Sequence, residues 1–100
     1  MRSSIFQYPY EKVFRRTRRA LSHLGLRILD SDESQGSITA ETNFSLTNST
    51  VKIDLIVEEM ENHDTKVTVT GLLVKKRFFQ KNKDLEARES EILETLSQII

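Results

Sequence analysis

The stretch Tyr10-Glu-Lys-Val-Phe-Arg-Arg-Thr-Arg-Arg-Ala-Leu-Ser-His-Leu-Gly25 decides how this chain folds. Its apolar positions recur at intervals of three and four, so at about 100° per residue they occupy one third of the circumference of a helix. Gly25 is a favourable residue just beyond the C-terminus of such a helix. A helix with this stripe requires an apolar surface to pack against. The stripe consists of Val13, Phe14, Thr17, Ala20, Leu21 and Leu24.

The segment before this helix predicts a short strand. Residues 2–8 have a β-favouring centre at Ile5 and Phe6 and lead into Pro9, which suits a turn or the first position of a helix. Glu11 then lies where a carboxylate interacts favourably with the helix dipole.

The residues after the helix predict four strands. Residues 26–29 form a short apolar run, which we expect to end in a polar turn over residues 30–36. Apolar and polar residues then alternate with the period of half-buried strands, because successive side chains in a strand point to opposite faces. The alternating segments are 38–46, 51–58 and 67–73, with turns predicted at 47–50 and 59–65.

A second helix is predicted from about Asn82, a possible N-cap, to the end of the sequence. Glu89 falls inside the apolar arc of this helix and interrupts its apolar face. Either a buried partner for the carboxylate or a frayed first turn would explain this irregularity. The apolar face consists of Leu85, Ile92, Leu93, Leu96 and Ile99.

The predicted order is therefore strand, helix, four strands, helix. Strands joined by short turns favour an antiparallel meander, and two amphipathic helices must then cover one face of it. At 100 residues the chain has the size of one domain. We expect a single α+β domain over residues 1–100, with a sheet of four to five antiparallel strands and both helices on one face.

Charge is balanced overall but segregated along the chain. Lys and Arg total 15 and Asp and Glu total 15, with basic residues concentrated in 1–27 and 67–83 and acidic ones in 28–66 and 84–100. The absence of cysteine excludes disulfides and thiolate metal sites. Without an apolar run of membrane-spanning length or a signal-like start, we expect a cytoplasmic protein that does not enter a membrane.

Few residues suggest catalysis. His23 and His63 belong to no local ligand pattern, and we interpret both as structural or solvated. With three glycines in total, the chain has neither a nucleophile elbow nor a glycine-rich phosphate loop. We therefore expect a protein that is not an enzyme and has no cofactor.

The acidic turn at residues 30–36 resembles a calcium loop only superficially. If the loop begins at Asp30, then Asp30, Asp32, Ser34 and Glu41 occupy its ligand positions 1, 3, 5 and 12. The glycine of such a loop belongs at position 6, whereas Gly36 is at position 7 and the flanks read as strands. A solvated β-turn is the better interpretation, and no metal is expected.

The most pointed local feature is the basic face of the first helix. It could bind phosphates of nucleic acid or another polyanion, with the basic connector after the last strand extending the patch and Phe78 or Phe79 available for stacking. The ordinary alternative is the solvated face of a surface helix. The candidate residues are Arg15, Arg16, Arg18, Arg19, Lys75, Lys76 and Arg77.

A second candidate surface is the outer face of the sheet. Ile56, Leu72 and Val74 fall on the side that points away from the helices. Apolar residues there could bind a protein partner or a second copy of the chain. The alternative is scattered surface apolar residues, which are common. Our first functional hypothesis is binding or self-association through this face, and polyanion binding is the second.

The chain also resembles small bacterial domains of unknown function with a strand-helix-strands-helix layout. The resemblance rests on Tyr8-Pro9-Tyr10-Glu11-x-Val13, on Ala20-Leu21-x-x-Leu24-Gly25, on Gly36-Ser-Ile38-Thr-Ala40-Glu41, and on Lys81-Asn82 before the last helix. Some domains of this layout look like the helix-grip modules of envelope lipoproteins. The resemblance implies a role in assembly or binding and no catalytic residue.

Overall fold

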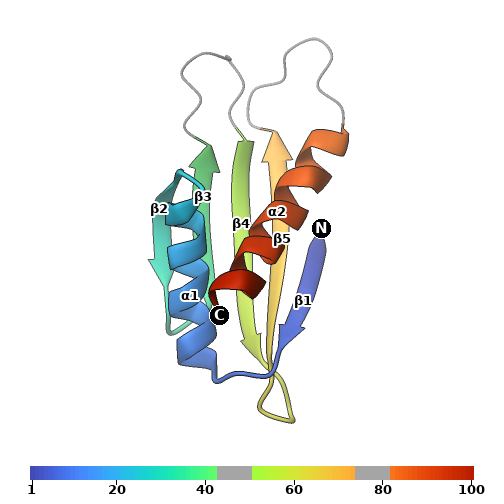
Figure 1. Cartoon of the computed structure of the whole chain (residues 1–100). Helices are drawn as coiled ribbons and strands as arrows, with labels where there is room; N and C mark the ends of the chain where they lie inside the picture. The colour runs from blue at the N-terminus through green and yellow to red at the C-terminus, as the bar shows by residue number, and fades with distance from the viewer. Residues whose placement is uncertain (43–50, 74–81) are drawn as a thin grey trace.

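The computed structural model describes residues 1–42, 51–73 and 82–100 and confirms the predicted α+β fold. Five strands and two helices follow the order β-α-β-β-β-β-α (Figure 1). In the described part of the chain, neither helix is long and apolar enough to cross a membrane. The elements are β1 (Arg2–Phe6), α1 (Tyr10–His23), β2 (Leu26–Asp32), β3 (Ser37–Thr42), β4 (Val51–Glu59), β5 (Thr65–Leu73) and α2 (Asn82–Ile99).

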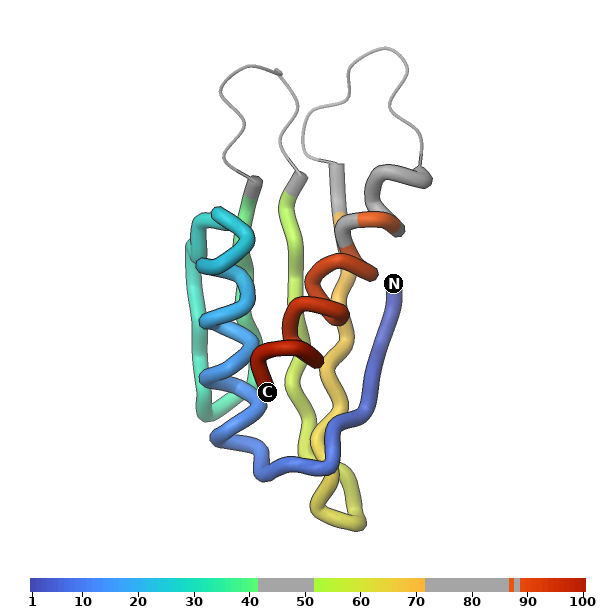
Figure 2. Tube along the Cα trace, viewed as in Figure 1, coloured from blue at the N-terminus to red at the C-terminus, as the bar shows by residue number. Residues whose placement is uncertain are grey.

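The strands form one antiparallel sheet in the order β1-β5-β4-β3-β2. Strands β2 to β5 are the predicted meander, whereas β1 lies beside β5, the last strand of the chain. Both helices lie on the same face of this sheet, α1 against β2 and β4 and α2 against β5 and β1 (Figures 1 and 2). The opposite face is covered by neither helix.

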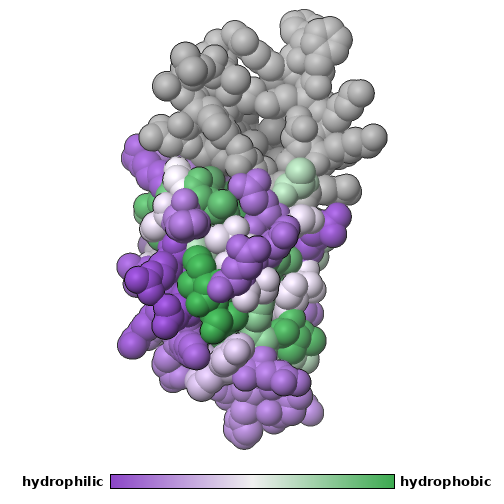
Figure 3. Space-filling view, in the orientation of Figure 1, coloured by the Kyte–Doolittle hydropathy of each residue, from purple (hydrophilic) through white to green (hydrophobic). Residues whose placement is uncertain are grey.

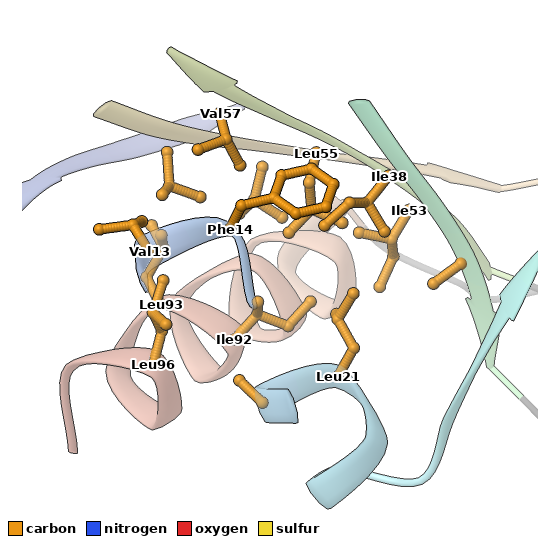
Figure 4. Close-up of a cluster of buried hydrophobic side chains, with 14 of the residues drawn as sticks. Val13, Phe14, Leu21, Ile38, Ile53, Leu55, Val57, Ile92, Leu93 and Leu96 are labelled. Atoms are coloured by element: carbon orange, nitrogen blue, oxygen red, sulfur yellow. The ribbon is translucent and has the colours of Figure 1, made fainter. Parts of the chain in front are cut away.

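The stripe of α1 forms the centre of the hydrophobic core. Phe14 points toward Leu55 and Ile38 of the sheet, while Ile92 of α2 lies on the side of Phe14 that faces away from the sheet (Figure 4). Thr17 belongs to the same stripe. This polar residue can be buried because its hydroxyl donates a 2.7 Å hydrogen bond to the carbonyl of Val13 one turn earlier. All residues of the predicted stripe are buried except Leu24, which is half-buried.

In the predicted apolar face of α2, Ile92, Leu93 and Leu96 are buried and Ile99 is half-buried, whereas the side chain of Leu85 lies outside the described residues. Glu89 is only 2% exposed, and the structure shows why an acid can lie there. Its carboxylate accepts a 2.8 Å hydrogen bond from the backbone N–H of Gly71 and pairs with the amino group of Met1 at 3.0 Å. A buried partner, rather than a frayed turn, explains the irregularity.

Strand β2 is longer than the predicted run of residues 26–29. It continues to Asp32 because an irregularity between Ile28 and Asp30 shifts the register by one residue. This bulge leaves Leu29 outside the pairing and lets Asp30 pair with Thr39. The turn therefore begins after Asp32 rather than at Asp30, which the polar composition of this segment concealed.

The β2–β3 turn is joined to β4 at Gly36 and to α1 at Glu33. The backbone N–H of Gly36 donates to the carbonyl of Asp32 at 2.8 Å, and its own carbonyl accepts from the N–H of Val57 at 2.7 Å. The hydroxyl of Tyr10, the first residue of α1, donates to the carbonyl of Glu33 at 2.5 Å. These bonds fix the start of α1 relative to the sheet.

Candidate anion-binding surface on the first helix

The basic side chains of α1 divide into a strip and one outlier. At about 100° per residue, Lys12, Arg15, Arg16 and Arg19 fall within an arc of about 100°. From Lys12 to Arg19 the strip is about 10 Å long, given a rise of about 1.5 Å per residue. Arg18 lies about 60° beyond Arg15, away from the centre of the strip. The same periodicity that buries the apolar stripe thus gathers four cations on the outer side of the helix.

The four cations of this strip line a shallow depression of about 520 Å³ together with Pro9 and Glu11. We call it the basic groove. Arg18 does not line it. The surface view shows strongly hydrophilic side chains over α1, beside an apolar area next to the C-terminal end of α2 (Figure 3). The groove is therefore a concave surface with four positive charges and one negative charge.

Few neighbouring groups neutralise these cations. The guanidinium of Arg15 is 3.6 Å from the carboxylate of Glu33, and its side chain is 71% exposed. The ammonium of Lys12 lies 4.5 Å from the centroid of the Tyr8 ring. Within the described residues, Arg16 and Arg19 form no ion pair with a carboxylate. Both guanidinium groups are therefore available to an anion in the groove.

The basic connector cannot be compared with this surface. Lys75, Lys76 and Arg77 lie outside the described residues, as do Phe78 and Phe79. Their extension of the basic patch stays a prediction. The four arginines of α1 are the part of the predicted polyanion site that the structure describes, and it brings three of them into the groove.

The outer face of the sheet carries Ile56, which is 44% exposed. Its paired residues on the neighbouring strands are Ser37 and Thr68, so its immediate surroundings are polar. Exposed Ile5 lies on the same face, because buried Phe6 beside it points to the other side. Val74 and the side chain of Leu72 are outside the described part of the chain.

The acidic turn is held by its own hydrogen bonds. The carboxylate of Asp32 accepts bonds from the hydroxyl and N–H of Ser34 and from the N–H of Gln35. The bond from the Ser34 hydroxyl, followed by the one from Gln35, lowers the pKa of Asp32. This is the solvated turn predicted from the sequence. Among the described residues, no group of three His, Asp or Glu side chains is arranged to hold a metal ion.

A second depression of about 340 Å³ adjoins the basic groove and shares Pro9 and Glu11 with it. We call it the tyrosine pocket, because Tyr8 and Tyr10 line it together with residues of the β4–β5 turn. The residues from the end of β4 and from that turn are Glu59, Asn62, His63 and Asp64. Sequence reasoning missed this pocket because its two sides lie about 50 residues apart and no local motif joins them. The pair of tyrosines around Pro9 was the one local signal.

Comparisons with known proteins give a fold but no family. No protein-family model matches this chain, and no curated protein sequence matches it. Its structure is similar to a crystal structure of the adenylate sensor from AMP-activated protein kinase in complex with 5-aminoimidazole-4-carboxamide 1-β-D-ribofuranotide (ZMP). The TM-score is 0.69 over 96% of this chain and 94% of that chain, with 11% sequence identity. Similarity at this identity shows the fold alone.

Proposed function

We propose that this protein is a non-catalytic binding domain that binds phosphate-bearing polyanions through the basic groove of α1. One observation carries the proposal: one depression gathers four cations, from Lys12, Arg15, Arg16 and Arg19. Two carboxylates, those of Glu11 and Glu33, lie nearby, so the cations outnumber them. Arginine side chains present planar forks of N–H donors that match phosphate oxygens. A neutral total charge does not oppose such binding, because the local field depends on the groove and its surroundings.

The structural neighbour offers limited support for this proposal. The adenylate sensor was crystallised with ZMP, a ribofuranotide, so a protein of this fold occurs in a nucleotide-binding assembly. The argument for this chain rests on its own cations.

The test is the salt dependence of binding. Fluorescence anisotropy with labelled duplex and single-stranded DNA and RNA should show binding at low salt that weakens as salt rises. If all four cations contact phosphates, the slope of log K against log[salt] should be about −3 to −4 for a duplex. Replacing one groove cation, as in Arg19→Gln, should reduce the magnitude of this slope by about 1.

Arg18→Gln is the matched control, because it removes the same charge from the adjacent residue outside the groove. We expect it to change the slope less than Arg19→Gln. Absence of binding at low salt would exclude the proposal. Equal effects of the two variants would show that the anion meets the helix without using the groove.

A second candidate function is favoured by the sheet face that neither helix covers. Both helices lie on the other face, and the uncovered face carries exposed Ile5 and Ile56. We propose that a protein partner or a second copy binds there. Ile56→Asp should then lower the mass measured by light scattering or abolish capture of the partner, while Thr70→Asp on the same face should do so less. An unchanged mass and unchanged capture in Ile56→Asp would remove the support for this function.

A further inference from the structure

The tyrosine pocket and the basic groove form two adjoining parts of one surface. They share Pro9 and Glu11 as lining residues. The Lys12 ammonium, which belongs to the groove, lies over the ring of Tyr8, which belongs to the pocket. A ligand with an aromatic ring and a phosphate a few ångströms apart could therefore occupy both parts at once.

The chemistry of the two parts is opposite. The groove is cationic, whereas the pocket has an aromatic ring beside the carboxylates of Glu59 and Asp64. An ionised carboxylate repels phosphate because both are negatively charged. It only accepts hydrogen bonds, so it favours a donor such as an amino group. A tyrosine ring is a surface on which nucleobases stack. The charges thus set one orientation, with the ring in the pocket and the phosphate in the groove.

One hydrogen bond joins the two sides of the pocket, and another closes the turn on one side. The hydroxyl of Thr65 donates to the carbonyl of Tyr8 at 2.8 Å, which ties the β1–α1 connection to the β4–β5 turn. The turn itself is closed by a 2.7 Å bond from the N–H of Met60 to the carbonyl of Asp64. Figures 1 and 2 show the connection running beside this turn. The tyrosine pocket is an open depression of about 340 Å³.

We infer that the surface recognises a nucleotide unit whose base carries an exocyclic amino group. The base stacks on Tyr8 and donates its amino hydrogens to the carboxylate of Glu59 or Asp64, while its phosphate contacts Lys12 and the arginines of the groove. This inference rests on the proposed function for its phosphate contacts and adds recognition of the base. The unit can belong to a free nucleotide or to a single strand, since both present the same base and phosphate.

The decisive probes differ by one group. AMP and IMP share a purine and a phosphate, but IMP lacks the amino group at position 6, and inorganic tripolyphosphate has no base. Isothermal titration of the full chain should show tighter binding of AMP than of IMP. Tyr8→Leu should weaken AMP binding about 5- to 150-fold, since base stacking on an aromatic side chain is worth about 1–3 kcal/mol. The same variant should weaken tripolyphosphate binding much less, because it changes only the Lys12 contact of the groove.

Glu59→Ala supplies a second variant at an exposed position and should remove the preference for AMP over IMP. Arg19→Gln should weaken AMP and tripolyphosphate alike. If tripolyphosphate binds but AMP binds no tighter than IMP, the inference is wrong and the proposed function survives. If neither binds at low salt, both are wrong. Comparing dAMP with a single-stranded oligo(dA) identifies the source of the unit, because a strand that engages the surface binds more tightly than its monomer.

Discussion

Gly36 occupies a position that no other residue fits. Its φ is +73°, and a Cβ atom added there would lie 2.2 Å from the carbonyl oxygen of Val57. Gly25 has a similar φ of +77°, but a Cβ atom there would meet no heavy atom within 4 Å. The two glycines therefore separate the cost of a left-handed backbone from the cost of a steric clash.

Gly36→Ala should destabilise the protein more than Gly25→Ala. The left-handed conformation alone should cost about 1 kcal/mol in both variants, and the clash with Val57 should add about 1–3 kcal/mol at Gly36 only. Urea unfolding followed by circular dichroism gives both free energies of unfolding. Equal losses in the two variants would mean that the sheet moves to accommodate the new methyl group.

Glu89 should be the most sensitive acidic residue of α2. Glu89→Ala leaves the N–H of Gly71 without its acceptor and the amino group of Met1 without its partner, which should cost about 1–3 kcal/mol of the free energy of unfolding. Glu94→Ala on the exposed side of the same helix is the control and should change stability by less than about 0.5 kcal/mol. Thermal or urea unfolding measures both. A loss no larger than that of the control would show that water replaces the carboxylate.

At the scale of the elements, Tyr10 connects α1 to the β2–β3 turn. Burial, followed by the charges of Glu33, Asp32 and Glu11, raises the pKa of Tyr10 above its ordinary value. The folded state therefore retains this proton to a higher pH than the unfolded state does. The resulting stability is fully present below the unfolded pKa of about 10 and is lost as the pH rises through the folded pKa.

Tyr10→Phe should remove this part of the alkaline loss. At pH 8 the variant should be less stable by about 0.5–1.5 kcal/mol, because the hydrogen bond to the carbonyl of Glu33 is absent. The difference from the wild type should shrink as urea unfolding is repeated up to pH 11. Tyr8→Phe serves as the comparison for loss of a tyrosine hydroxyl. A constant difference across this pH range would contradict the assignment.

The elements whose signal is local were predictable from the sequence. The stripe of α1 and the alternation around Ile53 and Val67 follow from the periods of helix and strand, so the order of elements follows as well. The extension of β2 was not predictable, since a bulge at Leu29 brings a polar segment into the ladder. The partner of Glu89 was also beyond reach, because it comes from the other end of the chain.

The candidate sites divide in the same way. Helical periodicity was enough to gather the arginines of α1 on one face. The same periodicity separates Arg18 from Arg19, but the depression that the other basic residues line required the shape of the surface. The tyrosine pocket depends on a tertiary hydrogen bond between Thr65 and Tyr8, which no local pattern encodes.

The whole molecule combines a net charge of zero with separated patches of opposite sign. The groove on α1 is cationic, whereas the β4–β5 turn and its flanks carry Glu58, Glu59, Glu61 and Asp64. Opposite patches on different copies attract each other when no net charge keeps the molecules apart.

Light scattering should therefore give the lowest second virial coefficient near the sequence pI of about 6.7, and added salt at that pH should raise it by screening the patches. Arg16→Glu combined with Arg19→Glu should shift the minimum to lower pH and weaken it, since the basic patch is removed. A coefficient that falls with salt at pH 6.7 would instead indicate apolar self-association.

The pairing of β1 with β5 also determines the order in which the fold can be completed. The hairpins from β2 to β5 join neighbours in sequence, whereas Arg2 lies opposite Val69 and Met1 contacts a residue 88 positions away. Closing such distant segments costs more chain entropy than closing a hairpin. During synthesis β1 leaves the ribosome before β5 and α2, so it must wait for both before it can complete its contacts. β1 is thus made before the strand on which its pairing depends.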